Sequence, residues 1–190
     1  MTEWPRISAL GDQALLVEFE PVIDIHRNRQ LHALARHLSS LFVERITDCV
    51  ASYHSLAVFY RPDCVSCHDI ERAVLAWTFS APSAVQPART ITIPVCYDLS
   101  LALDLEALAG HCQLSVEEVI SRHTTPDYHV HFLGFKPGFA YLGGLDAGLS
   151  MPRHATPRLL LPAGSVGIGG SQTGIYPQAG PGGWQIWRVH

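Results

Sequence analysis

The chain has 190 residues with 17 acidic and 13 basic side chains, and 47% of its residues are hydrophobic. A chain of this length and composition forms one domain or two small ones around a buried core, which excludes wholesale disorder. The acidic balance argues against nucleic-acid binding, and no apolar run reaches the roughly 18 residues that span a membrane. The first residues also lack the charge order of a secretion signal. We therefore expect a soluble cytoplasmic protein without a nucleic-acid or membrane partner.

The N-terminal part of the chain alternates between strand and helix patterns. Three leucines, Leu31, Leu34 and Leu38, recur at helical spacing. Asp24 precedes them and is a suitable N-cap, because its carboxylate can accept open backbone N–H groups. This alternation predicts a small sheet with helices on one face, so we expect an α/β domain over residues 1–80. The expected strands cover 14–19 and 56–60, and the expected helices cover 24–40 and 66–79.

A change of composition separates this domain from the rest of the chain. Residues 81–89 contain two prolines and several small side chains, which fit neither helix nor strand periodicity, so we expect a linker there. The pattern after it predicts a strand over 90–95 and two short helices. The first helix covers 104–111, and the second, over 115–123, begins with a capping-box sequence.

The last third of the chain is rich in glycine and poor in charge. Thirteen of the 15 glycines lie between Gly134 and Gly183, and the net charge changes from −6 over residues 1–125 to +2 over the remainder. Alternation predicts a strand over 128–135, and no helix is predicted after it. Short apolar stretches between Pro and Gly turns are typical of a barrel or sandwich. We expect one β domain over residues 90–190.

Two patterns resemble metal-binding motifs, and neither is favoured. The five cysteines are an odd number in a chain without an export signal, so reduced thiols are expected. The stretch from Cys64 to His68 matches the C-x-x-C-H haem pattern, but haem attachment normally needs export, and a zinc or redox pair is the alternative. His129 and His131 point to one strand face, yet no second pair has ligand spacing. We expect no metal or haem on this chain.

The glycine-rich stretch 164–170 invites comparison with phosphate-binding loops. It contains no P-loop pattern, and G-x-G-x-x-G fails because Gln172 stands at the last glycine position. A tight turn or bulge is the preferred interpretation, since glycine permits positive φ and close backbone approach. Binding of an anion or carbonyl oxygen by clustered glycine amides stays as the alternative.

Cationic residues are sparse in this glycine-rich and aromatic region. Lys136 is the only lysine of the chain, and Arg153 and Arg158 flank Pro157. Such cations can hold a carboxylate or phosphate, because a guanidinium pairs with either in a bidentate manner. We give this role and a solvated side chain equal weight for Arg158, and prefer the solvated side chain for Lys136.

A polar patch follows the glycine run. Gln172, Thr173 and Tyr176 carry an amide, a hydroxyl and a phenol, which can orient a small ligand in an apolar pocket. Trp184 and Trp187 are more typical of a core. No Ser/His/Asp set, zinc-protease motif or nucleophile elbow is present, so no residue is assigned as acid, base or nucleophile.

Long motifs in this region resemble one protein family. Residues 132–142, FLGFKPGFAYL, are similar to its LGF-x-PGF-x-YL signature, with Ala140 where the family usually has proline. The stretches ATPR, PAGSVGIGGSQTGIYP and PGGWQ, within residues 155–185, are similar to its most specific motif. Residues 11–14 and 54–58 resemble its N-terminal elements. The family comprises the B subunit of 5-oxoprolinase, allophanate hydrolase subunit 1 and the sporulation histidine-kinase inhibitor.

The resemblance implies an α+β fold, in which a small N-terminal α/β sandwich precedes a C-terminal cyclophilin-like β-barrel. Because family members continue through further strands after the last motif, we expect a barrel that is shortened or closes differently. The resemblance also implies a partner of the 5-oxoprolinase C-subunit or allophanate hydrolase subunit 2 type, and a third, lactam-hydrolase-like subunit. ATP would be bound in the assembled complex, either on this chain or on a partner subunit. The expected substrate-binding residues are Lys136, Gly138, Phe139, Arg158, Gln172, Thr173 and Tyr176.

The preferred function is the B subunit of an ATP-dependent 5-oxoprolinase, which opens the lactam of 5-oxoproline to glutamate. Two alternatives stay open at this point. One is an inhibitor of a sensor histidine kinase, and the other is a carboxyltransferase subunit of the allophanate hydrolase or urea carboxylase type.

Overall fold

A computed structural model describes residues 4–78 and 89–189 of the chain. The chain divides into two compact units, Met1–Ala88 and Arg89–His190. The expected linker over 81–89 lies outside the described residues except for its last residue. The helix expected over 66–79 ends earlier, at Ala76, because the backbone of Trp77 is extended.

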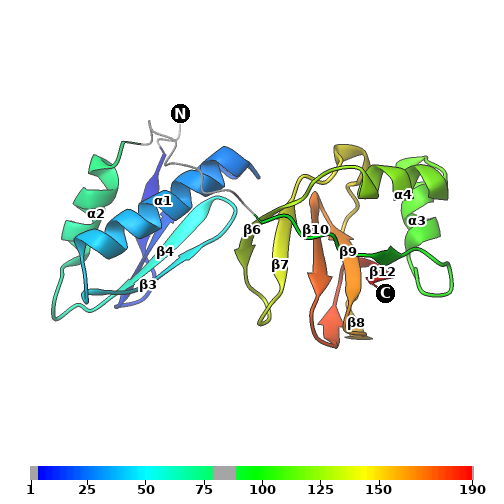
Figure 1. The fold of residues 1–190 in the computed structure, drawn as a ribbon. Helices are drawn as coiled ribbons and strands as arrows, with labels where there is room; N and C mark the ends of the chain where they lie inside the picture. The colour runs from blue at the N-terminus through cyan, green and yellow to red at the C-terminus, as the bar shows by residue number, and fades with distance from the viewer. Residues whose placement is uncertain (1–3, 79–88, 190) are drawn as a thin grey trace. The chain divides into compact units, whose positions relative to one another are not determined.

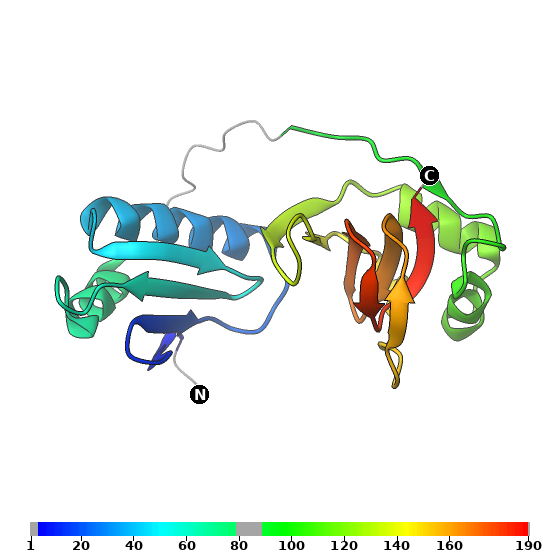
Figure 2. The ribbon, with the colours of Figure 1, turned by 90° about the horizontal axis from the view of Figure 1, so that it is seen from below.

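The N-terminal unit is an antiparallel sheet with two helices on one face (Figures 1 and 2). Helix α1 contributes Leu31, Leu34 and Leu38 to the core between the layers, as the periodicity predicts. The carboxylate of Asp24 accepts a hydrogen bond of 2.7 Å from the backbone N–H of Arg27, which confirms the predicted N-cap. The sheet order is β1–β2–β4–β3, with β1 Arg6–Ala9, β2 Ala14–Glu18, β3 Ile46–Ala51 and β4 Ser55–Tyr60, and the helices are α1 Ile25–Leu41 and α2 Cys67–Ala76.

The C-terminal unit contains a six-stranded antiparallel sheet in the order β5–β12–β9–β10–β7–β6, and a separate pair, β8 with β11. Two helices, α3 and α4, pack against one face of the larger sheet (Figure 1). The capping box predicted at the start of α4 is formed by Ser115 and Glu118. The elements are β5 Val95–Cys96, α3 Leu105–Cys112, α4 Val116–Thr124, β6 His129–Leu133, β7 Ala140–Gly143, β8 Arg158–Leu161, β9 Ser165–Gly169, β10 Gln172–Tyr176, β11 Gly180–Gly182 and β12 Gln185–Val189.

The expected α+β class is confirmed, and three details differ from the sequence predictions. Among the described residues the six-stranded sheet is open, because its end strands β5 and β6 do not pair with each other. The strand expected over 90–95 is wrong except at Val95: β5 pairs only with Arg188 and Val189 of β12, and Pro94 has no N–H to donate. A short 3₁₀ helix, Ala147–Leu149, interrupts the region in which no helix is expected.

The two faces of the C-terminal sheet carry different side chains. Val166 and Ile168 of β9 and Trp187 of β12 form one core cluster with Leu105 and Leu108 of helix α3. The opposite face carries a mainly aromatic cluster: Phe139, Leu161, Tyr176, Trp184 and Ile186. Successive residues of a strand point to opposite faces, which explains why the neighbours Ile186 and Trp187 belong to different clusters. The aromatic face contains the candidate site.

Candidate functional site

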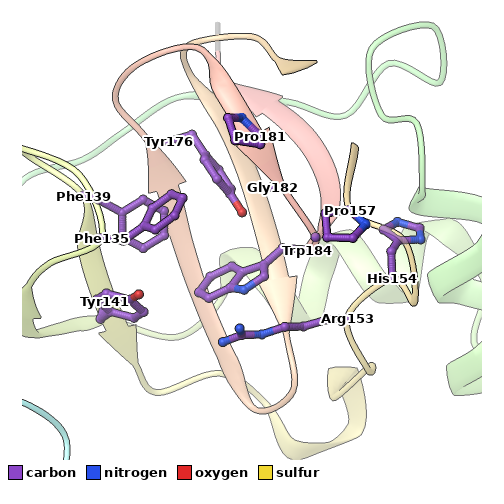
Figure 3. Close-up of a pocket in the computed structure, with 11 residues that line it drawn as sticks. Phe135, Phe139, Tyr141, Arg153, His154, Pro157, Tyr176, Pro181, Gly182 and Trp184 are labelled. Atoms are coloured by element: carbon purple, nitrogen blue, oxygen red, sulfur yellow. The ribbon is translucent and has the colours of Figure 1, made fainter. Parts of the chain in front are cut away.

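A cavity of about 280 Å³ lies on the aromatic face of the C-terminal unit (Figure 3). Its walls combine aromatic rings with two basic side chains, Arg153 and His154. A few polar groups in a mostly apolar hollow are typical of a site for a small molecule. The lining residues are Phe135, Phe139, Tyr141, Arg153, His154, Pro157, Tyr176, Pro181, Gly182, Gly183 and Trp184.

The aromatic rings of the cavity hold one another in edge-to-face contact. Phe139 is 1% exposed and lies at the centre, with its ring centroid 5.1 Å from that of Tyr176 and 5.6 Å from that of Trp184. The Phe139 ring also meets Tyr141 at 4.9 Å and Phe135 at 5.4 Å. Perpendicular rings at these separations attract one another beyond simple apolar burial. The cavity therefore has a firm, preformed wall.

Glycines of the specific motif make room for these rings. A Cβ at Gly169 would lie 2.5 Å from Nε1 of Trp184, so the indole sits directly on the β9 backbone. A Cβ at Gly182 would lie 2.8 Å from the hydroxyl of Tyr176. The predicted close approach at the glycine run is thus made by the protein's own aromatic side chains. Strand β9 pairs with β10 and β12 on its two sides, so its backbone amides form no phosphate cradle.

Two polar groups of the cavity can recognise an anion. The guanidinium carbon of Arg153 lies 5.7 Å from the centroid of the Trp184 ring, and Figure 3 shows the two side by side. A cation over an indole face is attracted by the ring, which orients the guanidinium. Burial raises the pKa of Tyr176 to about 12, so its hydroxyl keeps its proton near neutrality and can donate a hydrogen bond. Both groups suit a carboxylate ligand.

His154 contacts a partly buried ion pair that the sequence does not predict. Asp104, the N-cap residue of α3, accepts two hydrogen bonds of 2.7 Å from Arg158, one at each carboxylate oxygen. The backbone N–H of Ile186 donates to Oδ2 of the same carboxylate at 2.7 Å. His154 places Nε2 at 3.3 Å from this Oδ2 and at 2.9 Å from Nη1 of Arg158.

The pKa of Asp104 reflects this environment. Burial would by itself raise the pKa, but the hydrogen bonds from Arg158 and the Ile186 backbone outweigh it and hold the pKa below its usual value. The same pairing raises the pKa of Arg158. Both groups therefore stay charged, and together they form a fixed, neutral pair behind the cavity wall.

The structure brings together only part of the predicted site. Phe139 and Tyr176 line the cavity, and Arg158 lies behind it in the pair with Asp104. Nζ of Lys136 donates to the backbone oxygen of Ala179 at 3.3 Å, outside the cavity lining.

The other predicted residues lie elsewhere. Thr173 is on the helix-covered face, where its hydroxyl donates to the backbone oxygen of Gly167 at 3.0 Å and lies 3.3 Å from Nε2 of His123. Gly138, with φ of +80°, forms the turn before β7 and does not line the cavity, and neither does Gln172 at the start of β10. The alternation of strand side chains could have separated Thr173 from Tyr176, since an odd number of steps lies between them.

Sequence reasoning missed His154, Tyr141 and Trp184 as cavity residues, and named Arg153 only as a sparse cation. A usable signal was the basic pair Arg153–His154 between prolines, in a region with few other charges. Trp184 gave a second signal, because it alternates with the core residue Ile186 on the same strand face.

No group of three or more His, Cys, Asp or Glu side chains with the geometry of a metal site occurs among residues 4–78 and 89–189. All five cysteines are free, and Cys64 and Cys67 are exposed near the start of α2. The rings of His129 and His131 lie 5.5 Å apart on β6, as their spacing predicts. In the part of the chain that is described, no helix is long and apolar enough to cross a membrane.

Known proteins match the chain over nearly its whole length. The carboxyltransferase domain, subdomain C and D, matches residues 5–187. The B subunit of 5-oxoprolinase from Escherichia coli O157:H7 is 41% identical over 95% of this chain and 82% of its own length. The protein of the same name from Bacillus subtilis is 38% identical over 98% of this chain and 82% of its own length. The chain belongs to the family of 5-oxoprolinase B subunits. The predicted resemblance is thereby confirmed.

Solved structures agree with this assignment. The protein TTHA0988 superposes with a TM-score of 0.77 at 32% identity over 94% of this chain, which spans about a third of that longer protein (34%). The Pyrococcus horikoshii protein PH0987 is 38% identical over 97% of this chain and 85% of its own length, with a TM-score of 0.51. The urea carboxylase of Kluyveromyces lactis gives a TM-score of 0.76 at 19% identity, which shows a shared fold.

Proposed function

We propose that this chain is the B subunit of an ATP-dependent 5-oxoprolinase, which opens the lactam of 5-oxoproline to glutamate. One observation carries the proposal: three relatives that bear the name of this B subunit are 38–41% identical to the chain over 82–84% of their own lengths. The chemistry of the cavity supports it as well.

The cavity suits a small, flat, anionic ring compound. 5-Oxoproline is a five-membered lactam that carries one carboxylate. The rings of Phe139, Tyr176 and Trp184 offer flat apolar walls to such a ring. Arg153 would pair with the carboxylate, and the Tyr176 hydroxyl would donate a further hydrogen bond.

The other predicted substrate-binding residues do not line the cavity. Arg158 acts through His154 from behind the wall, because Asp104 occupies its guanidinium. Lys136, Gly138, Gln172 and Thr173 stay predictions for substrate contact.

Other subunits complete the enzyme in this proposal. No phosphate-binding loop is formed by the described glycine-rich stretch 164–170, so we assign ATP to a partner subunit. The partners are a protein of the 5-oxoprolinase C-subunit type and a lactam-hydrolase-like protein, in the cytoplasm. Opening a stable amide places negative charge on its carbonyl oxygen, and donors fixed in the cavity would stabilise that charge. No specific contact in the described residues favours kinase inhibition or carboxyl transfer.

Reconstitution tests the proposal. The chain, mixed with the two partner proteins from the same organism, is expected to hydrolyse ATP only when 5-oxoproline is present, with glutamate as product. Arg153→Ala is expected to raise KM for 5-oxoproline about tenfold or more, because a charge-assisted hydrogen bond contributes about 1.5–3 kcal/mol. Arg36→Ala, which changes an exposed arginine of α1, serves as the matched control. Absence of coupled ATP hydrolysis in the complete mixture, or full activity of the chain alone, would contradict the proposal.

A further inference from the structure

His154 occupies a position unlike that of any other side chain of the cavity. His154 lines the cavity, and its Nε2 meets the Asp104–Arg158 pair. The backbone N–H of His154 donates to the carbonyl oxygen of Gly183 at 2.7 Å, which anchors the residue on the segment before β12. Ring and backbone are therefore both held.

The contacts of Nε2 fix the position of the ring proton. Nη1 of Arg158 lies 2.9 Å from Nε2, and a guanidinium nitrogen can only donate a hydrogen bond. The lone pair of Nε2 must accept it, which leaves the proton of the neutral ring on Nδ1. A proton on Nε2 would set two N–H groups against each other, and its acceptor, Oδ2 of Asp104, already takes two donors at 2.7 Å and lies farther away, at 3.3 Å.

We propose that His154 is a catalytic residue whose Nδ1–H donates a hydrogen bond to the carbonyl oxygen of the small lactam bound in the cavity, and that Arg158, held by Asp104, is the positioning residue that fixes this tautomer. The inference rests on the proposed function and deepens it. No described group is hydrogen-bonded to Nδ1, so this N–H is available to a ligand. When water adds to the carbonyl carbon, negative charge builds on the carbonyl oxygen, and a fixed N–H donor stabilises that charge without reorganisation. The charge is released when the ring C–N bond breaks and the nitrogen takes up a proton to leave as the amine of glutamate.

Arrangement of the site around the carboxylate agrees with this role. Arg153, which directly precedes His154 in the chain, would hold the carboxylate of the ligand. The carbonyl oxygen of the ligand therefore needs a separate donor. A neutral imidazole can polarise a carbonyl group by donating a hydrogen bond to its oxygen. Arg158 orients that donor by occupying Nε2.

The tautomer is the first measurement, on the full 15N-labelled chain near neutral pH. Long-range 1H–15N correlation is expected to show His154 with a protonated Nδ1 and an unprotonated Nε2, assigned by loss of the signal in His154→Gln. In Arg158→Met, Nε2 is expected to become the protonated nitrogen and to donate to Asp104. A wild-type His154 with a protonated Nε2, whether neutral or doubly protonated, would overturn the inference without reference to activity.

Kinetics of the reconstituted complex form the second measurement. His154→Ala is expected to lower kcat by about 10²–10³, the loss seen for one donor to a developing oxyanion. His154→Asn, whose amide N–H can occupy the position of Nδ1–H, is expected to recover at least about tenfold of this loss. His111→Ala, which changes an exposed histidine of α3, is the control.

The outcomes separate the two proposals. A wild-type complex that does not open 5-oxoproline contradicts the proposed function. An active wild-type complex in which folded His154→Ala keeps its kcat, or in which His154→Asn recovers nothing, overturns the inference and leaves the proposed function standing.

Discussion

The two units of the chain keep their charged pairs in different environments. In the N-terminal unit the pairs Arg61–Asp63 and Arg72–Asp69 are solvated, with side chains between 41% and 66% exposed. In the C-terminal unit the Asp104 side chain is 6% exposed and is bonded through both oxygens to Arg158, whose side chain is 31% exposed. Solvated pairs contribute little to stability, and buried pairs rarely repay their desolvation. A buried pair beside a cavity is therefore better explained by a role in the site than by stability.

The hydrophobic cores of the two units also differ. The N-terminal unit fills the space between its sheet and helices mainly with aliphatic side chains, such as Leu31, Leu34, Leu56 and Val58. The C-terminal unit builds its second sheet face from rings that rest on glycines and leave a hollow between them. Closely packed aliphatic chains leave few voids, whereas rigid rings can frame one. Four experiments test this contrast.

Asp104→Ala is expected to have the largest effect, a loss of about 3–5 kcal/mol in the free energy of unfolding, measured by urea denaturation. The change leaves the guanidinium of Arg158 and the N–H of Ile186 without their acceptor. Asp63→Ala, in the exposed pair, is the matched control and should cost less than about 1 kcal/mol. Equal losses in the two variants would remove the contrast between the units.

Acid is expected to lower the free energy of unfolding of the C-terminal unit by about 3 kcal/mol, because the buried His123 resists protonation in the folded state. Burial lowers the pKa of His123 from 6.5 to about 4, so between these pH values the unfolded chain binds a proton that the folded chain does not. Stability is therefore complete above pH 6.5 and falls as the pH decreases towards 4. Asp104, whose pKa is held below 3.8, adds a further loss only at lower pH.

Urea denaturation at a series of pH values measures this dependence. His123→Gln should flatten the curve between pH 6.5 and 4, because an amide does not titrate there. An unchanged slope in this variant would show that other groups are responsible. His37→Gln, on α1 of the N-terminal unit, provides the comparison variant.

Gly169→Ala is expected to cost about 1–3 kcal/mol, the range for overpacking, because its Cβ would lie 2.5 Å from Nε1 of Trp184. Displacement of the indole should also change tryptophan fluorescence and weaken binding of 5-oxoproline. Gly110→Ala is the matched control: a Cβ there meets nothing within 4 Å, and alanine favours the helix α3 by roughly 0.5–1 kcal/mol. The two glycine variants should therefore shift the melting temperature in opposite directions.

The smallest effect is expected at helix caps, where the two units should behave alike. Asp24→Ala at α1 and Ser115→Ala at α4 each remove a side-chain acceptor for a backbone N–H, and each should cost about 1 kcal/mol in urea denaturation. Ser40→Ala is the control, since its hydroxyl bonds only to the Arg36 carbonyl inside the helix. A much larger cost at either cap would mean that the cap supports more than its own helix.

The sequence predicts those features that neighbouring residues determine. Both caps follow from residues within four positions of each other, and the leucine spacing of α1 places its buried face. The pair of Asp104 with Arg158 joins residues 54 positions apart, and no local pattern indicates it. The strand expected over 90–95 fails for the same reason. Whether a partner strand lies beside these residues depends on the tertiary structure, and β12 pairs only with Val95 and Cys96.

The candidate site shows the same limit. The close backbone approach expected of the glycine run is present, but residues 165–169 form strand β9 and not the preferred tight turn or bulge. The identity of the approaching ring, Trp184, depends on how β9 and β12 pair. Tyr176 and Phe139 can be placed in the site from the motif, whereas His154 enters it only through the return of the chain to β12.

Lys136 gives this chain a practical property. As the only lysine, it offers one ε-amino group, which lies 5.4 Å from the centroid of the Phe135 ring at the cavity wall. An amine-reactive dye would therefore attach beside the cavity and, apart from the α-amino group, at no second amine. Its emission would report ligand entry in real time, with the native cysteines left untouched.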